Sequence, residues 1–132
     1  MNDENPFADV PVVFSYTRKQ AIEDGVLVDL SSWAAETGFR IPVACTHEAW
    51  HGHIVPPQGT RELGQSERGR AHDVLWLLHL AIRGGHKQVD VLMFSVIFLQ
   101  ASGKQETVQF KAICGPGDDA EPTLTILMPH ED

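Results

Sequence analysis

The 132-residue chain has no apolar run long enough to cross a membrane. Its longest apolar stretches are Val74–Leu78 and Leu92–Leu99, and Ser95 interrupts the second. Both are well short of the roughly 20 residues that a membrane-spanning helix needs. The first residues, Met1–Pro6, are acidic and polar, unlike a secretory signal, which begins with basic residues. These absences predict a cytoplasmic protein without a membrane segment.

Cysteine is scarce too. Cys45 and Cys114 are the only two, too few for a disulfide scaffold, and no C-x-x-C pattern is present. Apolar residues precede both thiols in the sequence. We therefore expect each of them to be a buried, structural cysteine.

Basic residues are also few in comparison with acidic residues. The chain carries 10 Lys and Arg against 18 Asp and Glu, for a formal net charge of −8. Neutralising a nucleic-acid backbone requires a basic patch, so direct binding to DNA or RNA is not expected. An acidic surface favours solubility or docking on a partner with a basic surface.

Length and composition indicate an ordinary globular protein. Residues 1–132 are predicted to form a single domain, since the chain is 42% hydrophobic and 21% charged. Two parts depart from this pattern. Residues 1–10 are expected to form a loose acidic N-terminus, and the polar segment 56–69, with two prolines and three glycines, is expected to be a mobile loop.

The first half of the sequence predicts short strands alternating with short capped helices. The pair Thr17 and Gln20 forms a capping-box pattern, and Gly residues follow two of the expected helices. The predicted elements are a strand at Val12–Tyr16, a helix from Thr17 to Asp24, an extended segment at Val26–Val28, a helix at Trp33–Thr37 capped by Ser31 or Ser32, an extended segment at Ile41–Cys45, and a helix that Thr46 caps and that ends before Pro56.

The second half predicts one long helix followed by strands. Apolar residues occur all around the helix expected at Arg70–Arg83, which indicates burial in the body of the domain. The long apolar run Gln88–Gln100 predicts a central strand covered on both faces. Alternation at Thr107–Cys114 and Leu124–Met128 predicts two more strands, and the short turns predict a three-stranded antiparallel meander. The fold class is therefore α+β.

One motif in the sequence carries recognisable chemistry. The segment His47-Glu48-Ala49-Trp50-His51 has the HExxH spacing of zinc hydrolases, in which two His one helical turn apart bind Zn²⁺ and the Glu activates the bound water. The third ligand is not specified, because Ile54 and Pro57 stand where a metzincin has Gly and His. The competing interpretation is a partly exposed helix with surface histidines and an inward-facing Trp50.

A second polar cluster lies in the C-terminal half. Asp118, Asp119 and Glu121 follow a Gly-Pro-Gly turn. Three carboxylates could bind a divalent cation or contact a basic partner, although their spacing is not that of an EF-hand and such clusters commonly form a solvated hairpin tip.

Four segments carry a family resemblance. They are Phe14–Arg18, Ala21–Asp29, Asp73–Trp76 and the tail Lys111–Pro122. In these segments the chain resembles a family of small uncharacterised proteins encoded on bacterial plasmids, integrative elements and phages. The resemblance implies an accessory role in mobile DNA and no defined activity. The histidine cluster is not part of the family pattern.

Two hypotheses follow. The first is a non-enzymatic accessory factor of mobile genetic elements that binds another protein, with counteraction of a host defence system as one role. It requires no cofactor, and Asp118, Asp119 and Glu121 are its candidate contact residues. The alternative is a zinc-dependent hydrolase with His47 and His51 as metal ligands and Glu48 as the catalytic base.

Overall fold

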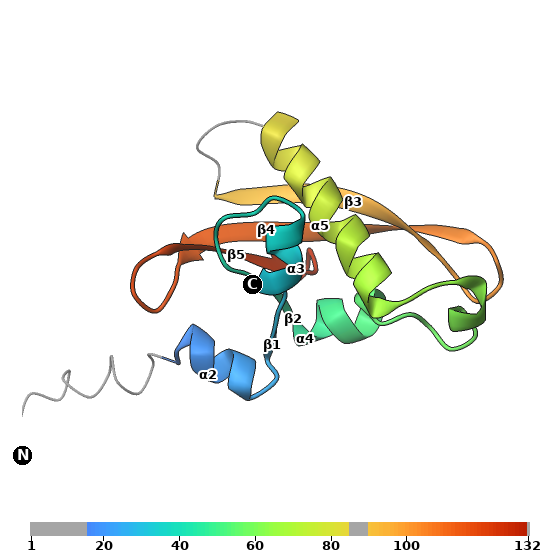
Figure 1. Cartoon of the computed structure of the whole chain (residues 1–132), viewed down its shortest axis with the longest axis horizontal. Helices are drawn as coiled ribbons and strands as arrows, with labels where there is room; N and C mark the ends of the chain where they lie inside the picture. Colours follow the sequence, from blue (N-terminus) through green and yellow to red (C-terminus); the bar gives the residue numbers. More distant parts are fainter. Residues whose placement is uncertain (1–15, 85–89, 132) are drawn as a thin grey trace, which may run out of the picture.

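The computed structural model describes residues 16–84 and 90–131 (Figure 1). Short helices and strands come first, then one long helix and three long strands. In chain order the elements are α2 (Arg18–Glu23), β1 (Leu27–Asp29), α3 (Ser31–Glu36), β2 (Val43–Thr46), α4 (His47–Ala49), the π-helix η2 (Trp50–Ile54), the 3-10 helix η3 (Arg61–Leu63), α5 (Glu67–Gly84), β3 (Val91–Leu99), β4 (Gln105–Pro116) and β5 (Pro122–Leu127). The predicted α+β class is confirmed.

The strands form one five-stranded mixed sheet in the order β1-β2-β5-β4-β3. The predicted antiparallel meander of β3, β4 and β5 is confirmed, with Phe94 opposite Phe110 and Ala112 opposite Ile126. The two short N-terminal strands extend it. β2 pairs in parallel with β5, and β1 pairs antiparallel with β2. A short strand of the first half of the chain and the last strand therefore lie side by side in the interior of the sheet.

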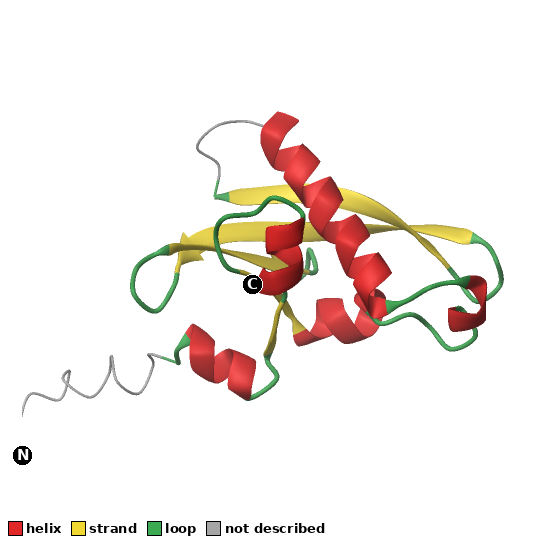
Figure 2. Ribbon diagram, viewed as in Figure 1, coloured by secondary structure: helices red, strands yellow, loops and turns green. Residues whose placement is uncertain are grey.

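Helices cover one face of the sheet. α3 and α5 lie side by side over it, and α5 runs diagonally across β3 and β4 (Figure 2). Between helices and sheet is the core, whose fully buried members include Leu75 and Leu78 of α5 and Phe110 of β4. The opposite face, which we call the outer face, is contacted by α2, because the Arg18 guanidinium donates to the outward-pointing hydroxyl of Thr125 in β5.

Local signals placed the N-terminal helices well, with one error. The capping box of Thr17 and Gln20 is present at the start of α2. The next helix begins at Ser31, earlier than predicted, so neither Ser31 nor Ser32 is its N-cap. The Asp29 carboxylate instead accepts the Ser31 N–H at 3.0 Å, a role that a serine hydroxyl was expected to fill. The strand predicted at 12–16 lies almost wholly outside the described residues.

The long helix is covered on one face only. α5 begins at Glu67, three residues before the predicted start, and the segment before it contains η3 and the fully buried Thr60. The helix packs on the sheet as expected for a central helix. The expectation that it is enclosed on all sides is wrong, however, because Trp76, Leu80 and Ile82 are each more than 40% exposed.

β3 is an edge strand, not the predicted central strand. Within the described residues its only partner strand is β4. Its side chains alternate between the core and the outer face, and Val91, Met93 and Ile97 on the outer face are exposed. A continuous apolar run predicts burial on both faces, but no helix covers the outer face of this strand in the described structure.

A single buried arginine connects the long helix to two other elements. Arg70 in the first turns of α5 is only 2% exposed. Its guanidinium donates to the backbone carbonyl of His53 at 2.6 Å, to the Gln65 side chain at 3.1 Å and to the backbone carbonyl of Leu99. It also lies 4.5 Å from the centre of the Phe98 ring. Desolvation lowers its pKa, so these neutral acceptors hold a charge that burial disfavours.

We expect Arg70→Met to lower the free energy of unfolding by about 3 kcal/mol, because two buried carbonyls lose their donor. The matched control is Arg68→Met, which removes an exposed ion pair with Glu36 and should cost at most about 1 kcal/mol. Urea unfolding followed by circular dichroism measures both. Equal destabilisation by the two variants would contradict a structural role for the buried guanidinium.

The two cysteines differ in environment. Cys45 is fully buried in the core, as predicted, whereas Cys114 is exposed, which corrects the expectation of two buried thiols. Burial, with a further contribution from the negative charge of Glu131, raises the pKa of Cys45 to about 12.

None of the helices in the described ranges is long and apolar enough to span a membrane.

Iodoacetamide at pH 8 is therefore expected to alkylate Cys114 and to spare Cys45 in the folded protein. At that pH a thiol with a pKa near 12 is ionised to roughly one part in ten thousand. Peptide mass mapping measures the modification, and Cys114→Ser should leave the native protein unlabelled. Labelling of both thiols at similar rates without denaturant would disprove the burial of Cys45.

Candidate binding groove on the outer face

A groove of about 860 Å³ lies over the outer face of the sheet. The sheet contributes its floor, which is apolar at Leu27 of β1 and Leu127 of β5 and polar at Thr125 of β5. α2 and the residue before its cap, Tyr16, line one side. The remaining lining comes from the start of α4, the β4–β5 turn and the C-terminal segment: Thr46, His47, Glu48, Pro116, Gly117, Asp118 and Glu131. The groove thus brings together residues from two sites that the sequence suggested separately.

Asp118 fixes the helical side of the groove. Its two carboxylate oxygens accept the backbone N–H groups of Arg18 at 2.7 Å and Lys19 at 3.1 Å, at the first turn of α2. The Arg18 side chain turns inward and donates to Thr125 Oγ1 at 2.8 Å and to the Leu124 carbonyl at 2.7 Å. Desolvation lowers the Arg18 pKa. These contacts attach a six-residue helix, too short to be stable alone, to the sheet.

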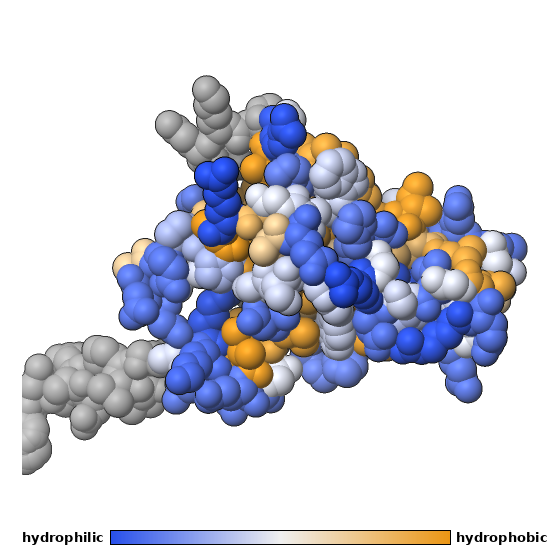
Figure 3. Space-filling view, viewed as in Figure 1, coloured by the Kyte–Doolittle hydropathy of each residue, from blue (hydrophilic) through white to orange (hydrophobic). Residues whose placement is uncertain are grey.

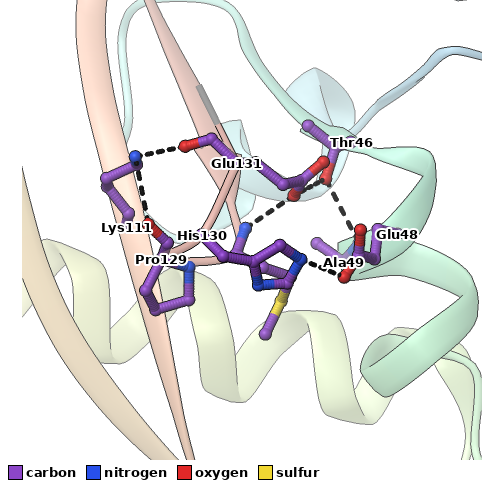
Figure 4. A network of polar contacts seen from close by, with 8 residues as sticks. Thr46, Glu48, Ala49, Lys111, Pro129, His130 and Glu131 are labelled. Carbon is purple, nitrogen blue, oxygen red and sulfur yellow. Dashed lines mark hydrogen bonds and ion pairs between the residues drawn. The ribbon is translucent and has the colours of Figure 1, made fainter.

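The C-terminal segment fixes another part of the lining. One carboxylate oxygen of Glu131 accepts hydrogen bonds from the Thr46 hydroxyl and the Met128 N–H, both at 2.7 Å (Figure 4). The same Thr46 oxygen accepts the Ala49 N–H at 3.2 Å, which confirms the predicted N-cap of α4. Thr46 therefore joins the start of α4 to the end of the chain.

Two further contacts hold this segment in place. The Lys111 ammonium donates to the backbone carbonyls of Pro129 and Glu131 (Figure 4). His130 Nε2 lies 2.6 Å from a carboxylate oxygen of Glu48, and both side chains are more than half exposed. The Glu48 carboxylate is therefore engaged by the C-terminal segment.

The HExxH residues lie where a helix places them. The His47 and His51 rings are neighbours, with centroids 4.2 Å apart. His53 is turned elsewhere, edge-on to Phe110 at 5.9 Å, and desolvation lowers its pKa. In the parts of the chain that the structure describes, no group of three or more His, Cys, Asp or Glu is placed to hold a metal ion. Zinc-dependent hydrolysis stays a prediction. The structure places the rings of its two expected metal ligands, His47 and His51, next to each other.

The acidic residues of the β4–β5 turn make hydrogen bonds that hold the structure together. Besides the Asp118 cap, a Glu121 carboxylate oxygen accepts the Asp119 N–H at 3.0 Å. Sequence reasoning missed the carboxylates that join this turn: Glu23 of α2 and Asp29 of β1 line a second, smaller depression together with Asp118 and Glu121. Nothing local indicates this arrangement, since about a hundred residues separate Arg18 from Asp118.

Asp118→Ala should lower the free energy of unfolding by about 1 kcal/mol, as expected for the loss of a carboxylate cap at a helix N-terminus. Amide hydrogen exchange at Arg18 and Lys19 should accelerate more than exchange in α5. Asp119→Ala is the matched control and should change stability by less than about 0.5 kcal/mol. If both variants are equally stable, Asp118 does not hold α2 against the sheet.

Comparison with protein families identifies the chain as a member of a family of unknown function, DUF6573, whose model matches residues 1–132. Searches of curated proteins and of solved structures found no match.

Proposed function

We propose that this DUF6573 protein is a non-enzymatic binding protein that holds an extended, basic segment of another protein in the outer-face groove. The observation that carries the proposal is the composition of the groove. A partly apolar floor and three carboxylates, those of Glu48, Asp118 and Glu131, line one cavity. A segment that alternates apolar and basic side chains complements both features.

Charge complementarity supports a basic occupant. The whole chain carries a net charge of −8, and the adjoining depression adds the carboxylates of Glu23, Asp29 and Glu121 and one further cation, Lys19. The cation that lines both cavities is Arg18, whose guanidinium donates into the sheet. The summed field should favour a cationic segment and accelerate its association, chiefly at low salt.

Exposed apolar surface supplies the second contribution. Val26, which follows α2 and lines the groove, is 51% exposed, and Figure 3 shows hydrophobic surface beside α2 and β1 with hydrophilic surface next to it. Covering such side chains removes apolar area from water, at roughly 25 cal/mol per Å². The polar contacts of Asp118 and Glu131 hold the lining in place before a partner arrives, which reduces the entropy cost of binding.

The resemblance noted from the sequence suggests the biological setting. Under this proposal the protein is an accessory factor of mobile genetic elements, and its partner is a host protein with a basic extended segment. Counteraction of a host defence system is the specific role to test, by asking whether the protein protects an incoming plasmid in a host that restricts it.

A short fluorescein-labelled peptide of alternating lysine and leucine residues is a direct probe of the groove. We expect saturable binding by fluorescence anisotropy that weakens as salt is raised, because exposed charges are screened. Val26→Arg should weaken binding at least about tenfold, or about 1.4 kcal/mol, by adding bulk and positive charge inside the groove.

Leu63→Arg is the matched control. Leu63 is also 51% exposed but lies in η3 and does not line the groove, so the two variants make the same change in net charge. This variant should bind the peptide nearly as well as the original protein. Equal weakening by both variants, or equal binding of a glutamate–leucine peptide, would show that the groove is not a specific site for basic segments.

A further inference from the structure

We propose that His47 and His51 form a two-ligand site for a divalent transition-metal ion of the Zn²⁺, Ni²⁺ or Cu²⁺ class, at the edge of the outer-face groove. The site is separate in chemistry from peptide binding and does not require it. It also differs from the hydrolase suggested by the HExxH pattern, because it assigns no catalytic part to Glu48.

The geometry of the two rings carries the inference. Their centroids are 4.2 Å apart and their planes are inclined by 37°. Two imidazoles that share a tetrahedral ion, each with a metal–nitrogen distance of about 2.0–2.1 Å, need coordinating nitrogens roughly 3.3 Å apart. Two neighbouring histidine rings on one side of a helix are the arrangement in which both imidazoles can bind one ion. Both residues are exposed, so an ion can approach from solvent.

The backbone under the pair is held firmly. Thr46 caps the start of α4, and the two residues on the inward side of α4 and η2, Ala49 and Ile54, are fully buried. Trp50, between the two histidines in sequence, stacks on Trp33 at 6.3 Å. The spacing of His47 and His51 is thereby fixed by the core and does not need the metal to form.

The donor set selects the class of ion. Imidazole nitrogen suits Zn²⁺, Ni²⁺ and Cu²⁺, whereas Mg²⁺ and Ca²⁺ prefer oxygen ligands. The remaining coordination positions stay open to water or to a donor atom of another molecule, since the Glu48 carboxylate contacts His130 and the His53 ring packs on Phe110. Binding without hydrolysis is the expected result.

The test uses the full chain without an affinity tag. Titration calorimetry with ZnCl₂ should show one saturable site, and the Cu²⁺ complex should give an electron paramagnetic resonance spectrum with splitting from two imidazole nitrogens. His51→Ala should reduce Zn²⁺ affinity at least tenfold. His72→Ala is the matched control, because His72 is another exposed histidine with a carboxylate, Asp73, nearby, and its removal should leave affinity unchanged.

Glu48→Gln separates this site from a hydrolase and should retain Zn²⁺ binding. Circular dichroism of the metal-free variants confirms that each is folded; if His51→Ala does not fold, His47→Gln replaces it. The proposal is overturned if no saturable binding is measured, if His51→Ala and His72→Ala bind Zn²⁺ equally well, or if the Cu²⁺ spectrum shows a single nitrogen ligand. Failure of the peptide to bind would not contradict the metal site, because metal binding is measured with the protein alone.

Discussion

The burial of one guanidinium constrains how the helical layer sits on the sheet. Arg70 reaches the last residue of β3 and the backbone of η2 at once, so the start of α5 has a single position relative to both. Three neutral oxygen atoms accept from this guanidinium, and a buried polar group that lost its partner would cost about 1–3 kcal/mol. Hydrogen bonds are directional, so these contacts specify the position of the helix start in addition to the apolar packing of Leu75 and Leu78.

Short elements and polar contacts cover the outer face of the sheet, where no long helix packs in the described part of the chain. No described helix longer than six residues covers it, and its centre is closed by polar contacts from the two ends of the chain. Arg18 and Asp118 tie α2 to β5 and to the β4–β5 turn before it, while Glu131 ties the C-terminal segment to Thr46. Short polar attachments leave space between them. The groove is what remains when a sheet face is covered by small elements instead of a long helix.

Local sequence signals predicted the local parts of this architecture. The Thr17 capping box, the Thr46 cap and the strand alternation around Phe110 depend on neighbours a few residues away, and the structure confirms each. The parallel pairing of β2 with β5 and the edge position of β3 depend on contacts across the chain, which periodicity does not encode. Arg70 gave no signal either, because a charged residue in a helix is normally exposed.

The candidate site also combines features that depend on nearby residues with features that depend on contacts across the chain. The HExxH spacing correctly brought His47 and His51 together, since that adjacency needs only a helix that begins at His47. What Glu48 does depends on His130, which reaches it only because β5 runs beside β2 and returns the C-terminus to the start of α4. A motif of five residues therefore specifies the adjacency of its two histidines, whereas the contacts of its glutamate depend on the fold. Here the fold directs the carboxylate to a histidine and leaves the two imidazoles exposed to solvent.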